Sequence, residues 1–252
     1  MNPMVYAAQT FWLVVVVFTA WGVRKLWTGV VQPKVINSVL LPGTLAGVLG
    51  HVLGLLVTGA TVRDTTLYKD DETGEPETTA DPKPRIPIIG PVIIGLLPLI
   101  SCGTGIYFNA KYLGGPIISG MGSEVVGPRL PTSLHGFWQL LRDQITLVES
   151  LVSSARAADF HDWRTSIFLY LLVCLVVRMA PFPGNLRGAL GAIVLLGIGG
   201  GIASSLFAVA DPRVQSAWAV LNLTVAALLF LLLFSLVIRG LIGLVSVLRN
   251  DA

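Results

Sequence analysis

The stretch LPGTLAGVLGHVLGLLVTGATV, residues 41–62, decides the class of fold. A transmembrane helix needs about 20 predominantly apolar residues, and this run is long and apolar enough to form one. Its only ionisable side chain is His51, which lies near the middle. A titratable ring inside a bilayer is costly, so His51 needs a reason to be there.

Composition extends this prediction to the whole chain. Of its 252 residues, 54% are hydrophobic and 12% are charged, and the mean hydropathy is +0.77. Soluble domains carry about twice that charged fraction. We therefore predict an integral membrane protein whose first partner is the lipid bilayer, and we expect it in a bacterial cytoplasmic (inner) membrane. A net charge of only +3 without a long basic run argues against nucleic acid as a partner.

Apolar segments predict an all-α, polytopic membrane helix bundle with five or six transmembrane helices plus an amphipathic interfacial helix. Five segments have the required length and composition: 8–26, 38–60, 164–181, 187–209 and 214–247. A sixth, 86–110, is interrupted by Pro87, Pro91 and Pro98. It is either a kinked helix or a re-entrant loop, because irregular backbone survives at that depth only beside protein or water.

Polar regions divide the chain into five parts. In order, these are two N-terminal transmembrane helices (1–62), an acidic solvated loop (63–85), the kinked or re-entrant membrane segment (86–110), a Gly/Pro loop with an amphipathic helix (111–163), and three C-terminal transmembrane helices (164–252). The amphipathic helix is predicted from apolar residues that recur every three or four positions between Phe137 and Val152. At the end of segment 164–181, Arg178 is expected to extend to the lipid headgroups.

Glycines surround the histidine at helical spacing, and they are Gly43, Gly47, Gly50 and Gly54. Small residues at three- and four-residue steps let a second helix approach the backbone closely. We therefore expect this part of the helix to be a packing face. The simplest interpretation of His51 is a buried, neutral ring that donates one hydrogen bond across that contact.

The same run resembles the zinc-motif helix of the site-2-protease family of intramembrane metallopeptidases. In that family the helix reads roughly H-E-L-G-H, and an apolar run, a glycine and a short extended piece come after it. Residues 49–51 (LGH) match the last three motif positions, and residues 59–62 (GATV) resemble the glycine and the extended piece. Gly47 stands where the resemblance places the first histidine, and Val48 stands where it places the glutamate. The family's third ligand is an aspartate from a later helix, and Asn185 takes its place in RMAPFPGNLRGALGAI.

Those replacements remove the chemistry that the resemblance would otherwise imply. Two histidines four residues apart hold one zinc ion, and the glutamate between them takes a proton from the metal-bound water. Glycine has no ligand atom and valine has no base. The resemblance thus implies a pseudo-peptidase that is not an enzyme, and a scaffold or structural subunit beside partner membrane proteins. No cofactor is expected.

Three other interpretations stay open at this point. His51 among glycines could be an axial ligand to haem or a chlorophyll-type pigment. The interrupted segment 86–110 resembles the broken helices of transporters, so a transporter or channel component is a second alternative. A residual metallopeptidase would need a rearranged zinc site, for which His135 and His161 are the other histidines.

Overall fold

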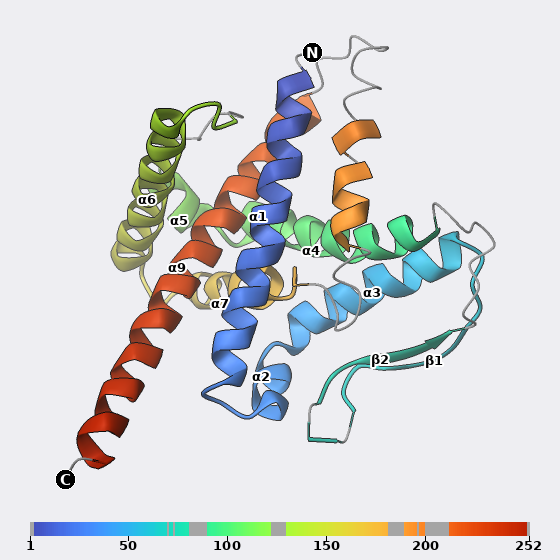
Figure 1. The fold of residues 1–252 in the computed structure, drawn as a ribbon, viewed down its shortest axis with the longest axis horizontal. Coiled ribbons are helices and arrows are strands. Elements are labelled where there is room, and N and C mark those ends of the chain that lie inside the picture. The colour runs from blue at the N-terminus through green and yellow to red at the C-terminus, as the bar shows by residue number, and fades with distance from the viewer. Residues whose placement is uncertain are drawn as a thin grey trace.

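The computed structural model describes residues 3–69, 71–72, 74–80, 90–121, 130–180, 189–195, 197–199 and 212–250. This part of the chain is mostly helical, as predicted (Figure 1). The helices are α1 (Pro3–Thr28), α2 (Pro33–Val39), α3 (Leu41–Val57), α4 (Gly90–Tyr112), α5 (Gly115–Gly120), α6 (Leu134–Ala157), α7 (Trp163–Val177) and α9 (Pro212–Asn250). Residues 189–195 and 197–199 are also helical.

Several of these helices begin at residues that favour a helix N-terminus. Pro33 and Pro42 lie in the first turns of α2 and α3, where the missing N–H of proline breaks no intrahelical bond. The hydroxyl of Ser133 caps α6 by accepting a hydrogen bond from the Gly136 N–H at 3.0 Å. The carboxylate of Asp162 caps α7 through the Arg164 N–H, also at 3.0 Å.

The predicted segment 38–60 is broken where α2 meets α3. The two helices bend by 82° at a break centred on Leu40, so α3 retains only 17 residues. Pro42 explains why one helix does not run through this point, because proline has no N–H to bond the carbonyl four residues earlier and its ring clashes with that carbonyl, whereas it is tolerated in the first turn of a new helix. A straight transmembrane helix over 38–60 is therefore not what the chain forms.

Strands β1 (Val62–Thr66) and β2 (Glu77–Ala80) form an antiparallel hairpin inside the region predicted as a solvated loop. The fold is therefore mostly helical but not all-α as predicted, because it includes this two-stranded sheet. Threonines on both strands favour extended backbone, and Thr65 pairs with Thr78. The connection turns at Gly74, whose φ of +59° suits glycine. On the exposed side of the hairpin, a hydrogen bond from Lys69 to Glu77 holds the pKa of Lys69 above its usual range.

Three helices of the described residues, α1, α4 and α9, are long and apolar enough to cross a membrane. The bent pair of α2 and α3 makes a fourth when it is counted as one span. The described residues therefore support membrane insertion with three or four candidate spans, whereas the sequence predicts five or six transmembrane helices for the whole chain. With 15 residues, α7 is about 22 Å long, which is less than the hydrocarbon core of about 30 Å. Much of the predicted segment 187–209 lies outside the described residues.

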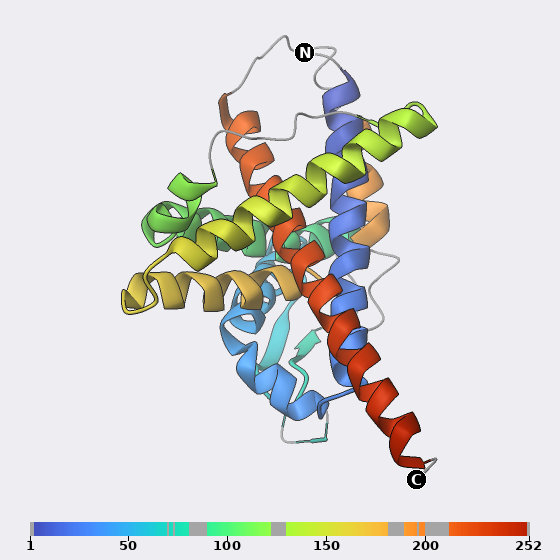
Figure 2. The same cartoon turned by 90° about the vertical axis from the view of Figure 1, so that its left-hand side faces the viewer.

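The helices cross instead of forming one parallel bundle. Figures 1 and 2 show α1 and α9 side by side, whereas α3, α4 and α7 run across them. A shared core of apolar residues joins α1, α4, α7 and α9. Cys102 and Cys174 are free thiols buried in it. Within the segment 86–110, residues 90–110 belong to the helix α4, which continues through Pro98, and residues 86–89 lie outside the described residues.

Polar side chains connect the end of α7 to α2, and α1 to the hairpin. Arg178, the C-terminal cap of α7, is only 6% exposed and donates a hydrogen bond to Oδ1 of Asn37 at 2.6 Å. Asn37 on α2 is 4% exposed. Nearby, Arg24 of α1 forms an ion pair with Glu75 of the hairpin connection. Arg178 therefore turns into the protein, and its predicted extension to the headgroups is wrong.

Replacing Asn37 by alanine tests this connection. The change removes the acceptor of a buried guanidinium, and a hydrogen bond to a charged group contributes about 1.5–3 kcal/mol. We expect Asn37→Ala to lower the free energy of unfolding by about 2 kcal/mol, measured by denaturation in detergent followed by circular dichroism. Ser38→Ala is the matched control, because the exposed Ser38 hydroxyl bonds only within its own helix, to Lys34 O. Equal stability of the two variants would contradict the assignment.

Candidate functional site

Helix α3 holds the candidate residues against two neighbouring helices at very short range. A Cβ atom added to Gly50 would lie 2.6 Å from the carbonyl oxygen of Leu97 and 2.7 Å from Cα of Pro98. A Cβ on Gly54 would lie 2.9 Å from Cα of Ile94. Real Cβ atoms essentially never come within 3.0 Å of such neighbours. The backbones of α3 and α4 are therefore in direct contact at two successive turns.

A third contact of the same kind joins α3 to α7. A Cβ on Gly43 would overlap the carbonyl group of Cys174 and would lie 3.0 Å from Cγ of Arg178. The phenol of Tyr170 also reaches this junction and donates to Val39 O at 2.8 Å. Gly47, the fourth glycine of the predicted packing face, is buried within α3. Helix α3 thus lies between α4 and α7 with Gly43, Gly50 and Gly54 at the contacts.

His51 takes part in the contact with α4. Its side chain is half-buried and makes a hydrogen bond with the backbone of Ile94. Ser101 makes a second polar link between the helices by donating to Ala46 O at 2.7 Å. The ring therefore lies beside the same turns of α4 that Gly50 and Gly54 touch.

Of the other functional positions compared with the zinc motif, the structure describes Gly47 and Val48. Gly47 and Val48 are both buried in α3, and Val48 is 3% exposed. Asn185 lies outside the described residues. Among the residues that the structure describes, no three His, Cys, Asp or Glu side chains lie close enough to hold a metal ion together.

The remaining histidines lie at exposed positions. His135 is in the first turn of α6, where a ring nitrogen lies 3.1 Å from Nε2 of Gln139. His161 precedes α7, and its Nδ1 lies 3.2 Å from a carboxylate oxygen of Asp159. The structure does not bring these two side chains into a cluster with His51. The rearranged zinc site considered for them is therefore not formed in the described part of the chain.

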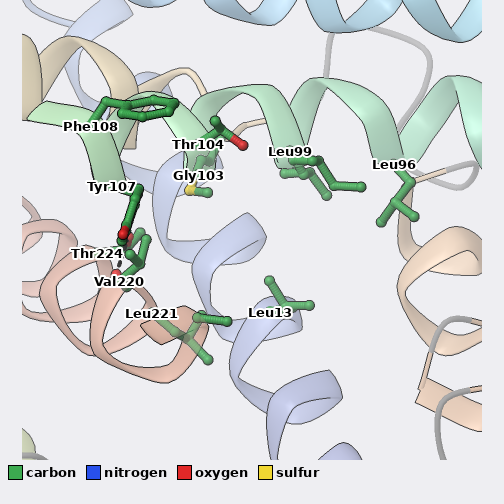
Figure 3. A pocket seen from close by; sticks show the side chains of 13 residues that line it. Leu13, Leu96, Leu99, Gly103, Thr104, Tyr107, Phe108, Val220, Leu221 and Thr224 are labelled. Carbon is green, nitrogen blue, oxygen red and sulfur yellow. Dashed lines mark hydrogen bonds between the residues drawn. The ribbon is translucent and has the colours of Figure 1, made fainter. Parts of the chain in front are cut away.

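A cavity between α1, α4 and α9 was not foreseen from the sequence. Its volume is about 520 Å³, and α4 contributes the longest wall. Figure 3 shows Leu13 of α1 and Leu221 of α9 facing this wall across the space. Gly103 lines the cavity and leaves room where a larger side chain would stand. A single glycine is a weak sequence signal for a cavity, because the chain contains 27 glycines.

Comparison of the chain with models of protein families, with curated proteins and with solved structures gives no match.

The close contact at Gly50 gives a direct prediction. Gly50→Ala places a methyl group against the backbone of Leu97 and Pro98, and overpacking of this kind costs about 1–3 kcal/mol. Gly240→Ala is the control, because a Cβ at Gly240 of α9 meets nothing within 4 Å. Alanine there is expected to be neutral or to stabilise by up to about 1 kcal/mol. Thermal unfolding in detergent should separate the two variants, and a Gly50→Ala protein as stable as Gly240→Ala would refute the contact.

Proposed function

We propose that this protein is a non-catalytic integral membrane protein with a site-2-protease-like core, and that it acts as a scaffold or structural subunit of a membrane complex. The observation that carries the proposal is the direct contact of the motif helix with a neighbouring backbone. The backbone of Leu97 and Pro98 fills the space beside Gly50, which is next to His51. A hydrolytic zinc site needs an open position for water at its metal, beside its ligands.

The path of the chain after α3 also supports the resemblance. In the family, a glycine and a short extended piece come after the motif helix. Here α3 ends at Val57, Gly59 adopts a φ of +77°, and β1 begins at Val62. The match concerns local backbone shape and the residues already compared. It supports kinship with the core of the family without restoring any of the lost catalytic groups.

Exposed apolar surface supports a role in the membrane beside other proteins. Helix α6 packs one face on the protein through Leu140, Leu147 and Leu151. Toward its N-terminus it also exposes Trp138 and Ile145, at 61% and 56%. We propose that α6 is the amphipathic interfacial helix. The location in a bacterial cytoplasmic membrane, and a total of five or six membrane segments, remain parts of this proposal.

Metal content and proteolysis test the absence of catalysis. The purified full-length protein should contain far less than one zinc ion per chain by mass spectrometry, and should not cleave transmembrane peptide substrates in proteoliposomes. His51→Ala should leave both results unchanged, as should the control His161→Ala. One zinc per chain that His51→Ala alone removes, together with cleavage, would overturn the proposal. A visible absorption band lost in His51→Ala would favour the pigment-binding alternative instead.

The scaffold role needs a separate test. Chemical cross-linking in native membranes, combined with blue native electrophoresis in mild detergent, should show the 26.8 kDa chain in a larger assembly. Gly50→Ala should reduce that assembly along with the stability of the fold, whereas Gly240→Ala should not. A chain that migrates as a monomer under every mild condition would contradict a role as a complex subunit.

A further inference from the structure

The cavity between α1, α4 and α9 has the chemistry of a site for an apolar chain. Leucines from all three helices line it, among them Leu13, Leu99 and Leu221. The hydroxyl of Thr224 is satisfied inside its own helix, because it donates to Val220 O at 2.7 Å. A lining of this kind offers an entering molecule dispersion contacts and few hydrogen bonds (Figure 3).

The size of the cavity suits one chain. A volume of about 520 Å³ is within the range of pockets that hold a single small ligand. Along α4 the lining runs from Leu96 to Phe108, which corresponds to about 18 Å of helix. One leaflet of a bilayer is about 15 Å of hydrocarbon, so the wall is as long as one acyl chain.

A cation lies beyond the cavity wall on the same face of α4. Leu96, Ile100, Thr104 and Tyr107 line the cavity and recur at helical spacing. Lys111 is the next residue in this row, one turn beyond Tyr107. Its Nζ lies 6.0 Å from the centre of the Tyr107 ring, so the ammonium group stands beside a ring that lines the cavity. Lys111 is exposed, and a negatively charged group can reach it.

From the apolar wall and the lysine at its end, we infer that the cavity binds a long-chain fatty acid, with the chain along α4 and the carboxylate at Lys111. A charged headgroup would pair with the ammonium group while the chain replaces lipid or water in the cavity. This assignment is independent of the zinc motif, because none of the lining residues belongs to it. It adds ligand binding to the proposed scaffold role.

Photolabelling in a bilayer tests the site. The full-length protein is reconstituted into phosphatidylcholine nanodiscs with a palmitic acid analogue that carries a diazirine midway along its chain. After irradiation, the labelled peptides are identified by mass spectrometry. Labelling is repeated in the presence of unlabelled palmitate, hexadecanol or octanoate. Hexadecanol has the same chain without the charge, and octanoate has the charge on a shorter chain.

Two pairs of variants test the binding of the acyl chain and the binding of the carboxylate separately. Gly103→Leu fills the cavity, where a Cβ has only Met179 Cε in ordinary contact at 3.7 Å, and Gly240→Leu adds the same side chain at an open position of α9. Lys111→Gln removes the charge at the site. Lys25→Gln removes another lysine that lies over an aromatic ring, 5.1 Å from the centre of Trp21. Because Lys111 is exposed, its variant remains informative even where Gly103→Leu fails to fold.

We expect labels on the cavity walls of α4 and α9, and palmitate should compete about fivefold better than hexadecanol. Lys111→Gln should abolish that difference in competition. Gly103→Leu should lower labelling at least fivefold. The controls Lys25→Gln and Gly240→Leu should be labelled like the native protein and show the same competition. Octanoate should compete poorly. The inference is overturned by labels spread evenly over the exposed C-terminal half of α9, which would show ordinary lipid contact. It is also overturned by equal competition from palmitate and hexadecanol in the native protein.

Discussion

The closeness of α3 to α4 and α7 is the constraint on which the rest of the structure depends. Hydrophobic burial cannot by itself hold helices together in lipid, because lipid tails are as apolar as leucine. Association then depends on packing and on hydrogen bonds between helices. Here Gly43 lies against α7, and Gly50 and Gly54 lie against α4, so α3 is in backbone contact with both. The hydrogen bonds of His51 and Ser101 add directed links to the same helix pair.

Polar connections complete the arrangement where the helices end. The guanidinium of Arg178 is buried against Asn37 just beyond the Gly43 contact, and Arg24 binds Glu75 of the hairpin. A buried cation needs a nearby acceptor, since removing one partner leaves an uncompensated charge. These pairs tie α7 to α2 and the hairpin to α1. The hairpin and α2 are thereby held beside the C-terminal parts of α1 and α7.

Much of the helical content could be predicted from hydropathy, but several local features could not. The runs around α1, α4 and α9 could be predicted because their length and apolar character are visible in any window. The break at Leu40 was missed, since Pro42 is equally compatible with the first turn of a helix. The hairpin was missed because its threonines stand among acidic residues typical of loops. The burial of Arg178 depends on Asn37, 141 residues away in the chain, and no local pattern records that contact. At the candidate site, His51 and the glycines could be singled out, whereas the α4 backbone beside them could not.

A single distance tests the central contact most directly. Solid-state NMR of the ¹³C-labelled protein in lipid bilayers can detect a through-space cross-peak between Cα of Gly50 and Cα of Pro98. Direct backbone contact predicts a strong cross-peak at short mixing times. Cα of Gly22 and Cδ1 of Leu232 provide an internal reference between α1 and α9, because a Cβ built on Gly22 would lie 3.7 Å from that Cδ1 atom. Absence of the Gly50–Pro98 cross-peak in spectra that contain the Gly22–Leu232 cross-peak would contradict the account.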